Sequence, residues 1–430
     1  MKQILRSIVC GLLERQVQNL RKKHKFTVVA VAGSVGKTST KLATARLLES
    51  TGKRVRYQEG NYNDRVSVPL VFFDETMPSL LNVFAWIGIL RRMDQQIKKD
   101  YSYDVVVVEL GTDGPGQMKD FAYIQPDITV VSAISPEHML QFGSIEKVAE
   151  EELTVAQYSW KLLVNKADTD ARYLKGLEFS SYAVGEEADY RAEITGPYGI
   201  VGQQLSVVTP AQDKFQVSTG YGGKQGATIV LAAVAVADML RVDPTQIAEA
   251  VAQLKPFAGR LQVLEGVNNS TIIDDTYNSS PLATQAALDL LYATKANQKI
   301  AILGDMNELG ESSAAEHRTL GAYCRAEELD YVVTIGTKSR DDLAPAAEEA
   351  GCRVKSFLSA TEAGKFVADI IQPGALILAK GSQNGVFTEE AVKQILKNPD
   401  DAKKLVRQSE EWLKNKSDTT RQLHKWPNTM

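Results

Sequence analysis

The stretch VVAVAGSVGKTSTKLATARLLES, residues 28 to 50, limits the possible folds of this chain more than any other. The β-rich apolar run Val28–Ala32 leads into a loop of small residues, and a helical pattern over Lys41–Leu48 follows. Backbone N–H groups at a helix N-terminus point outward, the helix dipole favours negative charge there, and glycine lets an anion approach the backbone. The stretch therefore predicts a strand, a phosphate-binding loop and a helix.

The loop also has the side chains that bind a nucleoside triphosphate such as ATP. A lysine at position 37 can reach the outer phosphates, and the hydroxyl of Thr38 can bind Mg²⁺. The predicted nucleotide-binding residues of the loop are Gly33, Ser34, Val35, Gly36, Lys37, Thr38 and Ser39. The usual spacing has a further glycine at position 31, where this chain has Val31. The alternative is therefore an ordinary strand-to-helix turn that contains Gly-Lys-Thr by chance.

Length and composition limit the class of protein. A chain of 430 residues is too long for one ordinary core, so two or three domains are expected. An apolar fraction of 44% and a charged fraction of 24% are typical of globular proteins, and a net charge of −4 does not favour nucleic acid as the main partner. The three cysteines, Cys10, Cys324 and Cys352, form no CxxC pair, which suits a reducing cytoplasm and implies neither a disulfide nor a zinc site. We expect a cytoplasmic monomer that acts on small-molecule or peptide substrates.

Residues 1–26 predict a basic amphipathic helix. Apolar residues recur there at helical spacing, namely Ile4, Leu5, Ile8, Val9, Leu12, Leu13, Val17 and Leu20. Four basic residues follow, Arg21, Lys22, Lys23 and Lys25. Such a helix either lies on an anionic membrane, here the inner face, or docks its apolar stripe on the body of the protein or on a partner protein. The pattern alone leaves these alternatives open.

Alternating apolar and helical runs organise the rest of the chain. Strand-like runs occur at 28–32, 105–110, 128–133 and 160–165, and again at 271–274, 300–303, 331–335 and 375–379. This alternation predicts an α/β protein: a central P-loop ATPase domain with a parallel sheet over 27–256, then a smaller Rossmann-like α/β domain over 257–398. Short strands over 180–220 predict an antiparallel patch. The tail, 399–430, is expected to be a charged helix with a disordered end.

Two polar residues follow the strands of the central domain. Glu109 ends the strand YDVVVVELG, at the sheet edge where the phosphate loop also lies, and is suited to hold Mg²⁺ directly or through water. His138 lies just after the next strand, as a second metal ligand or as a packing residue. The acidic run 150–152 lies on a helix, where at most one of its three side chains is expected to face the site.

Polar residues also end three strands of the second domain. The segments are IIDDTYNSSP (272–281), LGDMNELGE (303–311) and AKGSQNG (379–385). Each could be simple turn chemistry, because Asp, Asn, Ser and Gly favour turns. Together they predict a polar wall that faces the nucleotide.

These motifs, with AGSVGKTST, GNYNDRVSVPL, VVVVELG, HMLQFGS and GRLQ, stand in the order and spacing of the Mur ligase family. The chain most resembles the family's MurF branch, over about residues 27 to 396. The resemblance implies ATP-dependent amide bond formation through an acyl phosphate. In that branch D-alanyl-D-alanine is added to a UDP-N-acetylmuramoyl-tripeptide, so a role in peptidoglycan precursor synthesis is implied.

The resemblance also implies roles for individual residues. It makes Lys37 and Thr38 the phosphate and Mg²⁺ contacts, with Glu109 and His138 at the metal. It places Asn61 and Asn63 near the metal and phosphates, and Arg260 at the family's hinge. Asp275, Tyr277, Asn278 and Asp305 lie where the last domain meets the nucleotide and the incoming amine, and Lys380 matches the lysine of the KGS segment.

The chain departs from the family pattern in three places. About 26 residues precede the phosphate strand, so we expect the family's sugar-gripping first domain to be missing. The family's carbamylated lysine is replaced by Glu152, an anion that can approach Mg²⁺ without CO₂. The adenine segment reads GKQGATI, with Gln225 as the candidate contact.

Two other functions remain open at this point. One keeps the ligase chemistry with another acceptor, such as a poly-amino-acid, a folate-like molecule or a lipid-linked molecule. The other is a non-catalytic nucleotide-binding scaffold of wall synthesis. The intact phosphate loop and Glu109 favour an enzyme.

Overall fold

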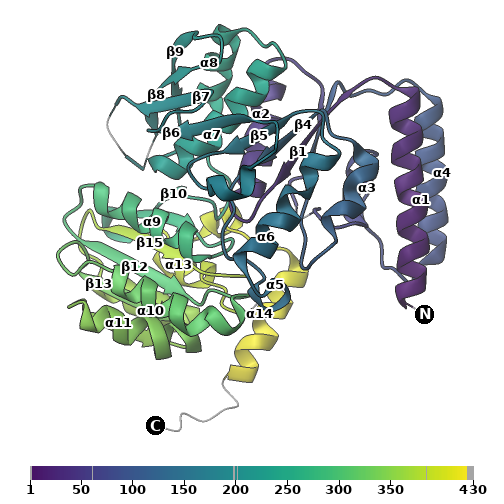
Figure 1. Cartoon of the computed structure of the whole chain (residues 1–430). Coiled ribbons are helices and arrows are strands. Elements are labelled where there is room, and N and C mark those ends of the chain that lie inside the picture. The colour runs from purple at the N-terminus through teal and green to yellow at the C-terminus, as the bar shows by residue number, and fades with distance from the viewer. Residues whose placement is uncertain (1, 61, 197–198, 201, 384, 424–430) are drawn as a thin grey trace. The chain divides into compact units, whose positions relative to one another are not determined.

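The computed structural model describes residues 2–60, 62–196, 199–200, 202–383 and 385–423. The chain folds into two compact units (Figure 1). Unit 1 comprises residues 1–195, 204–219 and 227–254, and unit 2 comprises 196–203, 220–226 and 255–430. Asn61 lies outside the described residues. So does the end of the tail, residues 424–430, which the sequence predicts to be disordered, whereas the helix that precedes this end is described.

Unit 1 contains a sheet of nine strands in the order β2-β3-β1-β4-β5-β6-β7-β8-β9. The strands are β1 (Thr27–Ala32), β2 (Val55–Arg56), β3 (Val105–Glu109), β4 (Ile128–Val131), β5 (Leu162–Asn165), β6 (Ser180–Val184), β7 (Tyr190–Ile194), β8 (Gln203–Val208) and β9 (Lys214–Thr219). The α-helices of this part of the chain are α1 (Lys2–Lys23), α2 (Lys37–Ser50), α3 (Ser67–Val71), α4 (Val83–Lys98), α5 (Met139–Phe142), α6 (Ile145–Glu152), α7 (Gly223–Met239) and α8 (Pro244–Gln253). Short helical turns are η1 (Met118–Ile124), η2 (Leu153–Gln157) and η3 (Ala171–Leu174).

Unit 2 contains a sheet of six strands in the order β10-β11-β15-β12-β13-β14. The strands are β10 (Gln262–Glu265), β11 (Thr271–Asp275), β12 (Lys299–Gly304), β13 (Tyr331–Ile335), β14 (Val354–Phe357) and β15 (Leu376–Lys380). The helices are α9 (Pro281–Ala293), α10 (Ser313–Tyr323), α11 (Ala344–Glu349), α12 (Ala360–Ile370), α13 (Glu389–Ile395) and α14 (Glu410–Leu423), with turns η4 (Val267–Asn269), η5 (Gly310–Ser312), η6 (Ser339–Leu343) and η7 (Pro399–Lys404). β10 runs antiparallel to β11, and the other pairs are parallel.

Both sheets confirm the predicted α/β class, because buried parallel strands alternate with helices in each. The predicted antiparallel patch over residues 180–220 is wrong for its first pair of strands. β6 and β7 pair in parallel, with Tyr182 opposite Tyr190, whereas β7 and β8 pair antiparallel as predicted. The Asp189 carboxylate accepts hydrogen bonds from the backbone N–H and the hydroxyl of Ser181, both at 2.7 Å. These bonds hold the returning chain beside the start of β6.

Helix α1 docks most of its apolar stripe on the body of unit 1, whereas Ile8 and Leu12 stay exposed, so the predicted contact with a membrane or a partner protein stays a prediction. Val9, Leu13, Val17 and Leu20 are buried in the same core as alternate residues of β1, and the helix packs on α3, α4 and η1. Residues at this spacing lie on one face of a helix, so burial of that face orients α1. None of the described helices is both long enough and apolar enough to span a bilayer.

Candidate active site

Three neighbouring strands of unit 1 end at the candidate site. β1 lies between β3 and β4, and all three run parallel. Their carboxyl ends therefore meet at one edge of the sheet, where ligands bind in open α/β folds. The phosphate loop follows β1, Glu109 ends β3, and the segment that contains His138 follows β4.

The phosphate loop needs its two glycines for different reasons. Gly33 has φ +114°, and a Cβ there would lie 2.7 Å from Ser132 Oγ and 2.8 Å from the carbonyl oxygen of Ala133. Gly36 has φ +86° and precedes α2, so no side chain caps the first turn of this helix. The N–H groups at the start of α2 are therefore not capped by a side chain, which is the arrangement that a phosphate-binding loop needs.

The Lys37 ammonium lies within the loop. Its Nζ donates to the carbonyl oxygen of Gly33 and, at 3.0 Å, to Glu137 Oε1. Burial alone would lower the pKa of Lys37, but the carboxylates of Glu137, Glu152 and Glu109 outweigh it and raise the pKa. The lysine therefore carries a full positive charge where the outer phosphates of a nucleotide would lie.

Glu109 lies in a buried polar cluster with residues of α2. Its Oε1 accepts hydrogen bonds from Thr38 Oγ1 at 3.2 Å and from Asn63 Nδ2 at 3.4 Å. Its Oε2 lies 3.2 Å from the Nζ of Lys41, and both side chains are almost fully buried. Burial raises the pKa of Glu109, but the positive charges of Lys41 and Lys37 lower it by a larger amount. The pKa of Glu109 therefore lies below its ordinary value. Glu109 is therefore a charged carboxylate beside the Thr38 hydroxyl.

The sequence interpretation missed Lys41. The signal was available, since a residue four positions after Lys37 lies on the same face of α2. Lys41 also donates a hydrogen bond to the carbonyl oxygen of Gly60 at 3.3 Å. It therefore links Glu109 to the segment that precedes Asn63.

Two members of the acidic run on α6 are buried, Glu151 and Glu152, and in agreement with the prediction one of them faces the phosphate loop. Glu152 is 1% exposed, and its Oε2 accepts a hydrogen bond of 2.6 Å from the backbone N–H of Gly33. Glu151 is also buried, but it accepts hydrogen bonds from the backbone N–H groups of Gly116 and Met118. Glu150 is exposed. Only Glu152 therefore contacts the phosphate loop.

Burial raises the pKa of Glu152, although Lys37 and the Gly33 N–H oppose that shift.

The four predicted metal ligands are not gathered into one cluster: Thr38 contacts Glu109, whereas Glu152 contacts the loop backbone. Within the described part of the chain, no group of three or more His, Cys, Asp or Glu side chains forms a metal site.

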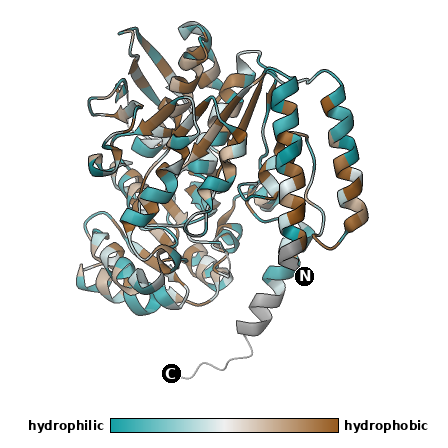
Figure 2. Cartoon of the chain, turned by 45° about the vertical axis from the view of Figure 1, so that its right-hand side comes forward, coloured by the Kyte–Doolittle hydropathy of each residue, from teal (hydrophilic) through white to brown (hydrophobic). Residues whose placement is uncertain are grey.

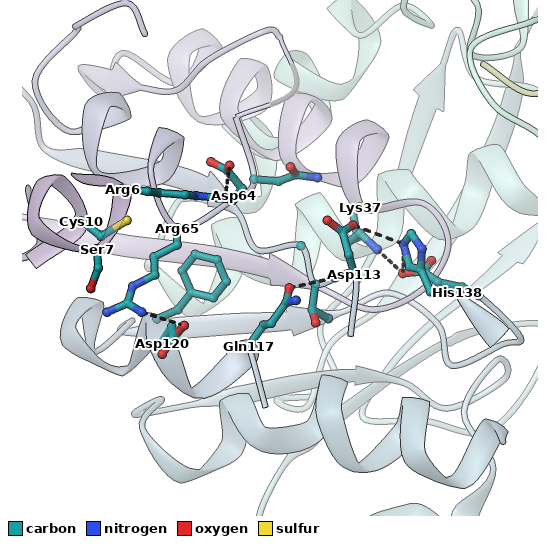
Figure 3. Close-up of a pocket in the computed structure, with 15 residues that line it drawn as sticks. Arg6, Ser7, Cys10, Lys37, Asp64, Arg65, Asp113, Gln117, Asp120 and His138 are labelled. Atoms are coloured by element: carbon teal, nitrogen blue, oxygen red, sulfur yellow. Dashed lines mark hydrogen bonds and ion pairs between the residues drawn. The ribbon is translucent and has the colours of Figure 1, made fainter. Parts of the chain in front are cut away.

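A pocket of about 360 Å³ opens beside Lys37 (Figure 3). His138 lines it in a left-handed conformation, with φ +48°, and its Nε2 lies 3.7 Å from Asp113 Oδ1. Asn63 lines it too, held by a hydrogen bond of 2.8 Å from the N–H of Gly111 to its carbonyl oxygen. Residues of α1, namely Arg6, Ser7 and Cys10, line the far end of the pocket. The structure therefore brings the predicted Asn63 and His138 into one cavity with Lys37.

In unit 2, two of the predicted strand-end residues form a buried ion pair. Lys380 Nζ lies 2.5 Å from Asp275 Oδ2, and it also donates a hydrogen bond of 3.0 Å to the carbonyl oxygen of Asn278. Burial lowers the pKa of Lys380 and Arg260 adds to that effect, while Asp275 opposes it. The pair arises because β11 and β15 are neighbours, with residue 275 opposite residue 380.

Breaking this pair should destabilise unit 2. We expect Asp275→Asn to lower the free energy of unfolding by about 3 kcal/mol, because it leaves the Lys380 ammonium buried without a counter-charge. Denaturant unfolding of the full chain, followed by fluorescence, measures the change. Glu265→Gln removes an exposed pair with Lys397 in the same unit and should change the free energy of unfolding far less. Equal losses in the two variants would contradict this interpretation of the buried pair.

Arg260 and Tyr277 also lie together. The Arg260 guanidinium is stacked over the Tyr277 ring, 4.1 Å from its centroid. Arg407, which the sequence interpretation missed, donates hydrogen bonds to the carbonyl oxygens of Thr276 and Tyr277 and pairs with the buried Glu389. No sequence pattern around Arg407, which lies in the tail, predicts its contacts with this segment. The segment that carries Tyr277 is therefore held from both sides.

Asp305 lies at the predicted strand end, but its carboxylate binds backbone. Oδ1 accepts a hydrogen bond of 2.6 Å from the N–H of Ser339 and Oδ2 one of 3.3 Å from that of Lys338. A Cβ at Gly336 would lie only 2.4 Å from this carboxylate, which explains the glycine. In this structure Asp305 stabilises the turn after β13, and its contact with a nucleotide or amine stays a prediction.

Gln225, the candidate adenine contact, lies in the first turns of α7. Its Oε1 is buried and has no hydrogen-bond partner among the described residues. A buried acceptor of this kind is costly unless a ligand or water donates to it. The predicted adenine contact is therefore compatible with the structure, and it stays a prediction.

Comparison with known proteins gives two family matches. Residues 31–237 match the Mur ligase middle domain, and residues 259–383 match the Mur ligase glutamate ligase domain. The first match contains the phosphate loop, Glu109 and Glu152, and the second contains Asp275 and Lys380.

Individual relatives agree with these matches. The chain is 27% identical over 379 residues to the UDP-N-acetylmuramoyl-tripeptide–D-alanyl-D-alanine ligase of Haemophilus influenzae, covering 85% of this chain and 76% of the relative. It superposes on MurF from Acinetobacter baumannii with a TM-score of 0.72 and 25% identity, covering 88% of this chain and 79% of the other. MurF from Thermotoga maritima in complex with ADP gives a TM-score of 0.70 at 24% identity, covering 90% and 83%.

Proposed function

The chain belongs to the Mur ligase family of ATP-dependent acid–amino-acid ligases, and on this premise we propose that it acts on a muramyl-peptide-type acceptor. The proposed amine substrate is D-alanyl-D-alanine or a similar small peptide, and the product is a peptidoglycan precursor. Relatives of about 25% identity that carry this activity in their names support the proposal.

The proposed reaction has two steps. An oxygen of the acceptor carboxylate attacks the γ-phosphorus of ATP, and ADP leaves. The amine then attacks the carbon of the acyl phosphate, loses a proton, and displaces phosphate, which retains the carboxylate oxygen. Negative charge on the transferring phosphoryl group is stabilised by Lys37 and by the N-terminus of α2.

Mg²⁺ fits the residues present. In nucleotide sites this ion typically binds one or two carboxylates, water and substrate phosphates, and the ionised Glu109 with the Thr38 hydroxyl supplies such donors. When bound there, the ion would neutralise phosphate charge. Lys41 keeps the Glu109 carboxylate ionised and oriented.

The observation that carries the proposal is that Lys37 belongs to both the phosphate loop and the pocket. An acceptor carboxylate in this pocket would lie beside the phosphates. The pocket wall formed by α1 offers the Arg6 guanidinium and the Ser7 hydroxyl to the rest of the acceptor.

ATP turnover with the substrates present tests this function. We expect ADP release to require both a muramyl-tripeptide acceptor and D-alanyl-D-alanine, with amide product formed in equal amount. Acceptors from other classes, such as folate-like or poly-amino-acid molecules, should not support turnover. ATP binding without turnover on any acceptor of the panel would instead favour a scaffold.

Glu109→Gln should raise the Mg²⁺ concentration needed for half-maximal turnover by about tenfold or more. The substitution keeps the size of the side chain but removes the charge that attracts the ion. A Mg²⁺ titration of ATP turnover measures the change. Glu150→Gln, which alters an exposed carboxylate in the same unit, should leave the titration unchanged. An unchanged titration for Glu109→Gln would show that Glu109 does not serve the metal.

A further inference from the structure

An apolar patch is exposed at one end of a helix pair in unit 1. Its seven large side chains are Ile8 and Leu12 of α1 and Met77, Leu81, Val83, Phe84 and Ile87 in and before α4. Phe84 is 87% exposed. A cluster of exposed apolar residues of this size marks an interaction surface more often than isolated exposed residues do.

Helices α1 and α4 lie side by side and run in the same direction (Figure 1). Gln16 Nε2 donates a hydrogen bond of 2.9 Å to Asp94 Oδ1, and Lys23 Nζ donates one of 3.0 Å to the carbonyl oxygen of Lys98. Since both helices advance together, their N-terminal parts lie at the same end of the pair. The exposed apolar residues of the two helices therefore lie at one end of the pair, where Figure 2 shows hydrophobic colour.

The helix pair is also strongly basic. Together α1 and α4 contain nine Lys and Arg residues but only Glu14 and Asp94 as acids, a net charge of +7, whereas the whole chain carries −4. Arg15 and Arg91 are exposed and lie one to two turns beyond the apolar end of their helices. Four of the basic residues, Arg21, Lys22, Lys23 and Lys98, lie in the last turns of the two helices, whereas Arg15 and Arg91 are exposed cations that lie nearer the apolar patch.

We propose that the α1–α4 pair docks the protein on an anionic lipid surface. The apolar end enters the boundary between headgroups and acyl chains, and Arg15 and Arg91 bind lipid phosphates at the headgroup level. The exposed Arg15 and Arg91, one to two turns beyond the apolar patch, favour lipid over a protein partner as the occupant, because a bilayer supplies an apolar layer beneath an anionic layer.

Docking in this way would bring the pocket to the membrane. α1 lines the pocket with Arg6, Ser7 and Cys10 and exposes Ile8 and Leu12 in the patch. The helix is therefore shared between pocket and docking surface. The proposal does not depend on the reaction catalysed, since lipid binding is measured without substrates.

Vesicle flotation with the full chain tests the proposal. We expect the protein to float with vesicles of phosphatidylcholine mixed with phosphatidylglycerol, at least about tenfold more tightly than with phosphatidylcholine alone. Added salt should weaken this binding, because headgroup attraction is screened. Equal binding to both kinds of vesicle, or none to either, would overturn the proposal.

Two variants and their matched controls assign the binding to the helix pair. Phe84→Asp should abolish flotation, whereas Trp160→Asp, at an aromatic residue that is 81% exposed outside the pair, should not change it. Arg15→Glu with Arg91→Glu should reduce binding at least about tenfold, whereas Arg353→Glu with Lys355→Glu should not. Flotation of Phe84→Asp at the wild-type level would overturn the proposal. So would self-association that Phe84→Asp abolishes in a chain that binds no vesicles, because a second copy would then cover the patch.

Discussion

Lys37→Ala should lower ATP turnover by at least about a hundredfold while the protein stays folded. The Lys37 ammonium is the cation of the phosphate loop, held by the Gly33 carbonyl and Glu137, and it supplies positive charge at the γ-phosphate. Its removal leaves the apolar core of unit 1 intact. A coupled assay of ADP release measures turnover, and circular dichroism during heating measures folding.

Lys119→Ala is the matched control for this prediction. Lys119 is an exposed lysine of the same unit, so its loss should change turnover little. If Lys37→Ala kept turnover near that of Lys119→Ala, the loop would be an ordinary turn and the nucleotide assignment would be wrong.

Glu152→Gln should lose most of the turnover. The glutamine keeps an oxygen that can accept the hydrogen bond from the Gly33 N–H, so the substitution removes mainly the negative charge. If that charge is needed beside the loop, Glu152→Gln and Glu152→Ala should be similarly impaired. Glu150→Gln, on the exposed side of α6, should behave as wild type.

Dependence on bicarbonate tests the prediction that Glu152 takes the place of the family's carbamylated lysine. An unmodified glutamate has a pKa of about 4.3, and even with the pKa raised by burial it needs no CO₂ to carry charge. Wild-type turnover should therefore not change with added bicarbonate, and Glu152→Lys should recover activity only when bicarbonate is supplied. A wild-type level of turnover in Glu152→Gln would leave Glu152 with a purely structural role.

Local sequence patterns predicted the features that depend on strand order and loop chemistry. The phosphate loop lies between β1 and α2 because β-branched residues favour the strand and the Gly-Lys-Thr turn favours a helix start. Glu109 meets Thr38 because parallel neighbouring strands end at one edge. The same rule explains why Lys380 lies beside Asp275.

Other features depend on tertiary packing, which the local pattern does not contain. Glu137, which precedes the left-handed His138, pairs with Lys37 across 100 residues of chain, and a local pattern contains no information on such a distant contact. The α1 stripe could not be assigned to core or membrane from its periodicity alone, because both environments select an apolar face. The sequence could not show whether the Asp305 carboxylate faces a ligand or binds backbone, because its hydrogen-bond donors belong to a turn more than 30 residues away.

Isotope transfer from the acceptor to phosphate tests the central claim most directly. An acceptor labelled with ¹⁸O in the reacting carboxylate is incubated with the protein, ATP and D-alanyl-D-alanine, and the released phosphate is analysed by mass spectrometry. The acyl phosphate route predicts one ¹⁸O atom in each phosphate, with ADP as the nucleotide product. Unlabelled phosphate, or AMP in place of ADP, would contradict it.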